Sequence, residues 1–200
     1  MSREPPRESP RESPRHRLFF ALQPDRETAR LIGSVQDQLV AVLNAGKVRR
    51  VPPERLHVTL LFLGNQGEEQ LGHLVTIASQ LEFAPCRLVL DHVGYFLGAG
   101  VAWLGGHETP PQLLEFQERL TMNVAEAGIE FDGRPWKPHI TLYRNLRTRP
   151  ETIDFKPMNW HIQDFILMES VQGRAGLRYV ARGRWPLSSR SPGSKETEFV

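Results

Sequence analysis

Apolar residues along the chain occur either in short continuous runs or at helical spacing, and this alternation predicts strands separated by helices. Residues 17–23 (RLFFALQ) form a short apolar run that is typical of a buried strand. In residues 27–43 the apolar positions recur every three or four residues, which predicts an amphipathic helix with Asp25 as its N-cap.

The same two patterns continue to the end of the chain. Further strands are expected at 55–64, 87–96, 101–104, 136–144, 164–171 and 177–185, and further helices at 68–81 and 111–127. Together these expected strands and helices indicate an α+β fold. Parallel βαβ winding is disfavoured because neither a GxGxxG nor a P-loop sequence follows any of these strands.

The two ends of the chain lack apolar periodicity. Residues 1–16 repeat Arg-Glu-Ser-Pro, and proline at every fourth position prevents a stable helix. Residues 188–200 are similarly polar. We therefore predict two disordered tails and one folded unit over residues 17–187.

Composition narrows the class of protein. The 200 residues are 40% hydrophobic and 24% charged, which is sufficient for a buried core. No run of 18 apolar residues occurs, and the polar N-terminus does not resemble a signal peptide. The only cysteine, Cys86, fits a reducing compartment. We expect a cytoplasmic, monomeric protein that does not bind membranes.

The net charge argues against a general duplex-DNA binder. In the first 17 residues five arginines outnumber three glutamates, which accounts for the whole formal charge of +2. The remaining body is neutral, whereas a DNA-binding domain carries a basic face. An anionic ligand would have to be held by a few placed groups.

One tetrapeptide carries candidate chemistry because it occurs twice. His57-Val-Thr-Leu recurs as His139-Ile-Thr-Leu, and both copies lie on predicted strands. Chance would produce two such copies in about one of ten thousand chains of this composition. Since side chains alternate along a strand, each copy presents an imidazole and a hydroxyl on one face, about 7 Å apart.

A pair of histidines suits metal-free phosphodiester chemistry. With an ordinary pKa near 6.5, one imidazole can be neutral and take a proton from water while the other is protonated and gives a proton to a leaving alkoxide. Threonine hydroxyls and an arginine can hold the phosphoryl oxygens. No GxSxG sequence or activated cysteine is present, and the other histidines lack metal-ligand spacing. We expect no metal and no cofactor.

Four stretches resemble the two-histidine (2H) phosphoesterases, in particular the RNA 2′,3′-cyclic phosphodiesterases that were historically called 2′-5′ RNA ligases. They are RLFFALQP at 17–24, LHVTLLFLG at 56–64, RPWKPHITLYR at 134–144 and FILMESV with the following YV and WPL at 165–187. Together they cover nearly all of the predicted folded unit. The resemblance implies a bilobal, pseudo-symmetric α+β fold with two antiparallel sheets, helices on their outer faces and a central cleft.

The resemblance also implies a reaction and residue roles. The reaction opens a terminal 2′,3′-cyclic phosphate of RNA, such as that of a tRNA fragment, to a 2′-phosphate without a metal. By carry-over His57 is the proton donor to the departing 3′ oxygen, and His139 is the base that accepts a proton from water. Thr59 and Thr141 would bind phosphate oxygens, and Arg144 would help to hold the phosphate or the base. Phe62, which occupies the position after His57 that Arg144 occupies after His139, would stack on a nucleobase.

Two other functions use the same residues. The reverse reaction would ligate a cyclic-phosphate end to a 5′-hydroxyl, but water at high concentration favours hydrolysis unless the second end is well held. A non-catalytic RNA-end-binding module would tolerate arginine or lysine in place of the paired histidines. Hydrolysis is therefore the leading hypothesis.

Overall fold

The computed structural model describes residues 15–43, 48–174 and 176–187, so nearly all of the two predicted tails lies outside the described residues. Three α-helices are present in the described part: α1 (Arg26–Ala41), α2 (Glu68–Gln80) and α3 (Pro111–Glu126), and a 3-10 turn, η1, spans Pro53–Arg55. The strands are β1 (His16–Leu22), β2 (Arg49–Arg50), β3 (Val58–Gln66), β4 (Cys86–Leu90), β5 (His92–Phe96), β6 (Val101–Gly105), β7 (Ile140–Arg144), β8 (Met158–Ile162), β9 (Asp164–Gly173) and β10 (Gly176–Pro186).

The main sheet has eight strands whose order is nearly symmetric about its centre. The order is β10-β9-β1-β3-β7-β6-β5, with β2 added beside β7, and β4 and β8 form a separate two-stranded sheet. All of the pairings are antiparallel. β3 and β7 share a single register pair, Val58 with Ile140. The sheet therefore consists of two four-stranded halves, here called lobe 1 (β10, β9, β1 and β3) and lobe 2 (β2, β7, β6 and β5), as expected for one antiparallel sheet per lobe.

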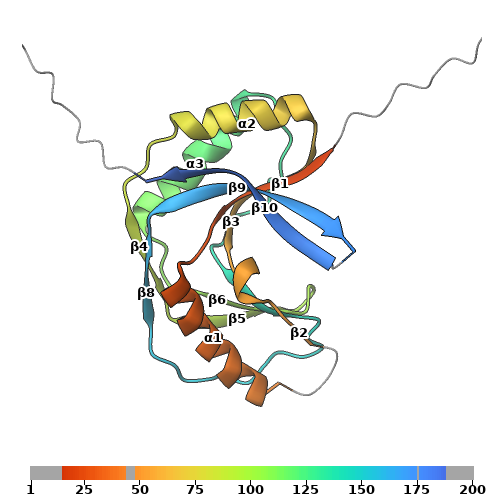
Figure 1. Cartoon of the computed structure of the whole chain (residues 1–200). Coiled ribbons are helices and arrows are strands. Elements are labelled where there is room, and N and C mark those ends of the chain that lie inside the picture. The colour runs from red at the N-terminus through yellow and green to blue at the C-terminus, as the bar shows by residue number, and fades with distance from the viewer. Residues whose placement is uncertain (1–14, 44–47, 175, 188–200) are drawn as a thin grey trace, which may run out of the picture.

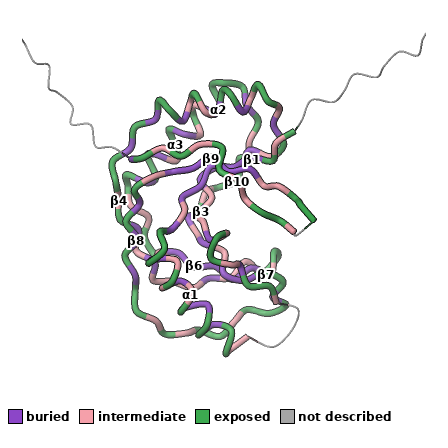
Figure 2. The backbone as a smooth tube through the Cα atoms, in the orientation of Figure 1, coloured by how far each residue is buried: buried purple, intermediate pink, exposed green. Residues whose placement is uncertain are grey.

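The helices cover the outer faces of the two lobes. Figure 1 shows α2 and α3 beyond β1 and β9 at one end of the molecule, and α1 beside β5 and β6 at the other end. Figure 2 shows that buried positions follow the central strands, whereas much of the outer surface of the helices is exposed. No helix in the described ranges is long and apolar enough to cross a membrane. The predicted α+β fold with outer helices is confirmed.

Local signals set the ends of these elements. The Asp25 carboxylate accepts a hydrogen bond of 2.8 Å from the Thr28 backbone N–H, which confirms the predicted N-cap of α1. β1 begins at His16, one residue earlier than expected. The two ring nitrogens of His16 lie 2.9 Å from carboxylate oxygens of Glu68 on α2 and Glu169 on β9, and these contacts raise the pKa of His16.

Three strand predictions were wrong in detail. The strand expected from Arg55 begins only at Val58, because Pro53–Arg55 forms the η1 turn, so His57 lies just before β3. The expected strand over 87–96 is interrupted at Asp91, whose carboxylate binds His107, so β4 pairs with β8 whereas β5 pairs with β6. The strand expected from Trp136 begins only at Ile140. The pattern also missed β8, because only alternate residues of β8 are buried in a short and partly polar segment.

A β-bulge follows the histidine motif in each lobe. Leu60 has no partner, since Ala21 pairs with Thr59 and Phe20 pairs with Leu61. Leu142 likewise has none, since Trp103 pairs with Thr141 and Ala102 pairs with Tyr143. Each bulge puts two successive residues into the core, and the residue five positions after the histidine returns to the face that carries the motif. We call this face of the sheet the site face.

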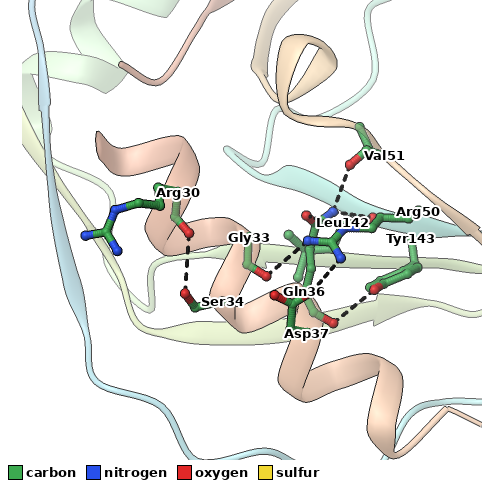
Figure 3. Close-up of polar contacts among 9 residues, drawn as sticks. All are labelled: Arg30, Gly33, Ser34, Gln36, Asp37, Arg50, Val51, Leu142 and Tyr143. Carbon is green, nitrogen blue, oxygen red and sulfur yellow. Dashed lines mark hydrogen bonds and ion pairs between the residues drawn. The ribbon is translucent and has the colours of Figure 1, made fainter. Parts of the chain in front are cut away.

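A glutamine from an outer helix donates to the carbonyl of each bulge residue. Gln117 of α3 donates to the Leu60 carbonyl at 3.3 Å, and the fully buried Gln36 of α1 donates to the Leu142 carbonyl at 3.0 Å. Gln36 also donates to the Val51 carbonyl and accepts from Arg50 Nε, while the Tyr143 hydroxyl donates to the Gln36 backbone carbonyl (Figure 3). α1 follows β1 of lobe 1 but packs on lobe 2, and α3 follows β6 of lobe 2 but packs on lobe 1.

Replacement of Gln36 by leucine tests this arrangement. The change leaves the buried Val51 carbonyl and Arg50 Nε without their side-chain partner, so we expect a loss of about 2–4 kcal/mol in the free energy of unfolding. This corresponds to a decrease of roughly 5–12 °C in the thermal midpoint, measured by calorimetry.

Ser34→Ala is the matched control on the same helix. The exposed Ser34 hydroxyl donates only to the Arg30 carbonyl, at 3.4 Å, so this substitution should change stability by less than about 0.5 kcal/mol. Equal midpoints for Gln36→Leu and Ser34→Ala would contradict the role assigned to Gln36.

Candidate active site

One register pair brings the two histidine motifs together. The Val58 and Ile140 side chains are fully buried, and side chains alternate, so the residues on either side of them point to the opposite face. These four neighbours, all only partly buried, are His57, Thr59, His139 and Thr141. Antiparallel geometry about the pair places each histidine on the same side of it as the threonine of the other strand.

Both imidazoles are held by the same kind of hydrogen bond. His57 Nδ1 lies 2.7 Å from the Arg55 carbonyl, and His139 Nδ1 lies 2.7 Å from the Lys137 carbonyl. A carbonyl can only accept, so Nδ1–H donates in both rings and Nε2 is left for chemistry. The two rings are therefore presented as the same tautomer.

Aromatic side chains pack around each imidazole. The His57 ring centroid lies 5.1 Å from that of Phe19 and 5.3 Å from that of Tyr179. The His139 ring centroid lies 5.0 Å from that of Phe96 and 6.0 Å from that of Trp103. These walls fix the ring planes and exclude water from one side of each ring.

Burial and neighbouring cations keep both imidazoles neutral at pH 7. Burial lowers the pKa of His57 to about 4 and outweighs the hydrogen bond to the Arg55 carbonyl, which raises it. The charges of Arg144 and His139 lower the pKa of His57 further, by smaller amounts. Burial also lowers the pKa of His139, assisted by Arg144 and Lys137. Since each positive group disfavours protonation of the imidazoles, the substrate-free site is poised to receive an anion.

Arg144 supplies a cation to this site. The bulge at Leu142 turns Arg144 back to the site face, and its charge acts on both His57 and His139. Among the described residues no carboxylate pairs with the Arg144 guanidinium. The exposed guanidinium is therefore available to a phosphoryl group, for which its planar array of donors is well suited.

Phe62 occupies the corresponding position in lobe 1. It packs with Phe19, Ala21, Ile166 and Met168 on the site face, and the guanidinium of Arg17 lies 4.9 Å from its ring centroid. Simple alternation from His57 would turn residue 62 toward the core, and the bulge at Leu60 reverses this. The structure thus brings the predicted histidines, threonines and Arg144 to one face and sets Phe62 at its lobe 1 side.

The sequence interpretation missed the aromatic residues that surround the imidazoles. Phe96, Trp103 and Tyr179 were recognised only as parts of strands. Their positions depend on which strands pair and in which register, and a single sequence carries no local signal for these long-range pairings. In the described part of the chain, no group of three or more His, Cys, Asp or Glu side chains is placed to hold a metal ion.

Comparison with known proteins relates this chain to phosphoesterases. A family model described as LigT like Phosphoesterase matches residues 22–103. The RNA 2′,3′-cyclic phosphodiesterase of Escherichia coli K12 is 30% identical over 184 residues, which cover 86% of this chain and 97% of that protein. The protein of the same name from Archaeoglobus fulgidus is 30% identical over 165 residues, which cover 78% of this chain and 91% of that protein.

A solved structure shares the fold. The crystal structure of Escherichia coli LigT complexed with 3′-AMP superimposes with a TM-score of 0.76 at 29% identity, and the match covers 88% of this chain and 99% of that one. The match therefore extends over parts of both lobes. This chain belongs to the LigT-like branch of the two-histidine phosphoesterases, the family of the RNA 2′,3′-cyclic phosphodiesterases.

Proposed function

We propose that this phosphoesterase hydrolyses the 2′,3′-cyclic phosphate end of RNA to a 2′-phosphomonoester, without a metal, by paired general acid and base catalysis. The observation that carries the proposal is the register pair of Val58 with Ile140, which sets two imidazoles of the same tautomer on one face of the sheet. The names of the curated relatives support RNA with a cyclic phosphate end as the substrate.

Two histidines share the proton transfers of the proposed reaction. His139 Nε2 takes a proton from water as the water oxygen bonds to phosphorus. The bond between phosphorus and the 3′ oxygen breaks, and His57 Nε2–H gives its proton to that oxygen. The products are a 2′-phosphate and a free 3′-hydroxyl, and the two histidines exchange protons with solvent before the next turnover.

The low pKa of His57 has a consequence for this scheme. In the substrate-free protein His57 is neutral, so it must gain its proton when the anionic phosphate binds. Because the pKa of His57 is low in the substrate-free protein, its protonated form is a strong acid. This favours proton donation to the alkoxide.

The remaining predicted residues have binding roles in the proposal. The Thr59 and Thr141 hydroxyls donate to the non-bridging phosphoryl oxygens, and Arg144 stabilises the charge that develops on them. The exposed part of the Phe62 ring stacks on the terminal base. Ligation to a 5′-hydroxyl is the reverse of the same chemistry, and it would appear as a joined product in the assay below.

Substitution of either histidine tests the mechanism. His57→Gln and His139→Gln should each lower the hydrolysis rate of a 2′,3′-cyclic-phosphate oligonucleotide by about 100-fold or more, because each removes one proton transfer. The thermal midpoint of each variant should stay close to that of the wild type. The phosphate position in the product, read by phosphorus NMR, should be 2′.

Chelation provides the control for the metal-free step. Activity of the wild type should be unchanged after treatment with EDTA. A reversible loss of activity on chelation, or a histidine variant with a near-wild-type rate, would contradict the mechanism.

Anion binding should be coupled to proton uptake by the histidines. Sulfate imitates the charge of a phosphate and does not titrate near neutral pH. A bound anion raises the lowered pKa values, so between pH 4 and 6.5 the complex should carry more protons than the free protein, and sulfate affinity should increase as the pH falls from 7 to 5. Calorimetric titrations at pH 5.5 in buffers with different ionisation enthalpies measure this uptake.

The double variant His57→Gln/His139→Gln is the matched control for this titration. It should bind sulfate without the pH-dependent proton uptake. Wild-type binding that takes up no protons at pH 5.5 would show that the imidazoles do not face the anion.

A further inference from the structure

A second group of cationic and aromatic side chains lies on the site face of lobe 2, beyond the proposed catalytic residues. Directly paired residues share a face, and Trp103 pairs with both Thr141 and Gly94. His92 and Phe96 are two residues from Gly94 in either direction along β5, so they lie on the same face. A row of rings thus runs from His139 along β5 to its start.

Trp103 forms the floor of this row. A side chain at position 94 would place its Cβ 2.0 Å from the indole, so only glycine leaves room for the ring. The Trp103 ring centroid lies 5.3 Å from that of Phe96 and 5.4 Å from that of His92. The Lys137 ammonium lies 4.3 Å from the Trp103 ring centroid, in a cation–π contact.

Positive groups outnumber negative groups at the far end of the row. The His92 ring centroid lies 4.7 Å from that of His107. Asp91 accepts hydrogen bonds of 2.9 Å from His107 Nδ1 and 3.0 Å from the His107 backbone N–H. The charge of Arg149 also acts on His92, and no carboxylate in the described ranges pairs with the Lys137 ammonium. We call His92, His107 and Lys137 the basic corner.

Cationic side chains near His92 outnumber carboxylates. Burial, His107, Lys137 and Arg149 all lower the pKa of His92, and only Asp91, which also binds His107, opposes them. An excess of cations over carboxylates is typical of a surface that meets an anion. An apolar floor beneath them is typical of sites for single-stranded nucleic acid, where bases stack on rings and the backbone follows positive charge.

The basic corner also lies at a suitable distance from the reacting phosphate. From Phe96, beside His139, to His92 the strand extends about 13 Å. Successive charges of one helical strand lie about 3.4 Å apart along its axis, so a strand whose terminal phosphate occupies the histidine pair spans this distance within about four nucleotides.

We propose that the basic corner binds a phosphodiester a few nucleotides upstream of the RNA end, so that the enzyme prefers an RNA strand to a mononucleotide. The inference rests on the proposed function, since it takes the cyclic phosphate to lie between His57 and His139. The corner offers the upstream phosphate the ammonium of Lys137 and the imidazole of His92. His107 Nε2–H adds a further donor when that ring is protonated, since His107 Nδ1–H donates to Asp91. Trp103 holds these groups at a fixed distance from the reacting end.

The test compares a nucleoside 2′,3′-cyclic phosphate with a pentanucleotide that ends in the same cyclic phosphate. For the wild type, kcat/KM should be about tenfold higher for the pentanucleotide, and this preference should decrease as the salt concentration rises. In His92→Gln/His107→Gln the ratio of the two kcat/KM values should fall toward one. His107→Gln alone, whose side chain is 67% exposed, should lower the ratio without affecting folding.

His73→Gln is the matched control. His73 is an exposed histidine on α2, on the outer surface of the molecule, and the ratio should keep its wild-type value in this variant. A wild-type ratio near one, or a wild-type ratio in the His92→Gln/His107→Gln variant, would overturn the inference while the proposed function stands. Failure of the wild type to open either substrate would overturn the proposed function and this inference with it.

Discussion

The site depends on the contact between two strands that pair at only one position. Val58 and Ile140 are fully buried where lobe 1 meets lobe 2, and on either side of this pair the strands diverge. The segment before the second motif supplies hydrogen-bond donors to the backbone carbonyls of β3. The Asp132 backbone N–H donates to the Phe62 carbonyl, and Trp136 Nε1–H donates to the Thr59 carbonyl. One register pair is thus enough to bring the two histidine motifs to the same face of the sheet.

The two lobes have nearly the same backbone arrangement but present different side chains to the site. Both lobes use the same motif, the same tautomer, the same bulge and a glutamine that donates to the bulge carbonyl. The residue that each bulge returns to the site face is Phe62 in one lobe and Arg144 in the other. One lobe thus offers an aromatic surface and the other a charge, which suits a ligand with a base on one side and a phosphate on the other.

The sequence predicted the features that depend on local pattern. The three helices, the Asp25 cap and the two motif strands follow from spacing within a few residues, and the twofold occurrence of the motif predicts that His57 and His139 act together. Features that depend on distant partners were not predictable in this way. Asp91 interrupts a strand because His107 binds it, and Phe96, Trp103 and Tyr179 reach the imidazoles through sheet register. The bulges could not be predicted either, because whether a residue is left unpaired depends on the register of the neighbouring strand.

The crossed placement of the helices makes the lobes interdependent. α1 leaves lobe 1 to cover lobe 2, α3 leaves lobe 2 to cover lobe 1, and β4 pairs with β8 from the later part of the chain. Neither half of the polypeptide can therefore bury its own core, and unfolding of either lobe removes the cover of the other. On the ribosome, lobe 1 is incomplete until the C-terminal strands β9 and β10 emerge. The surroundings of His57, which include Tyr179 of β10, are therefore completed only at the end of synthesis.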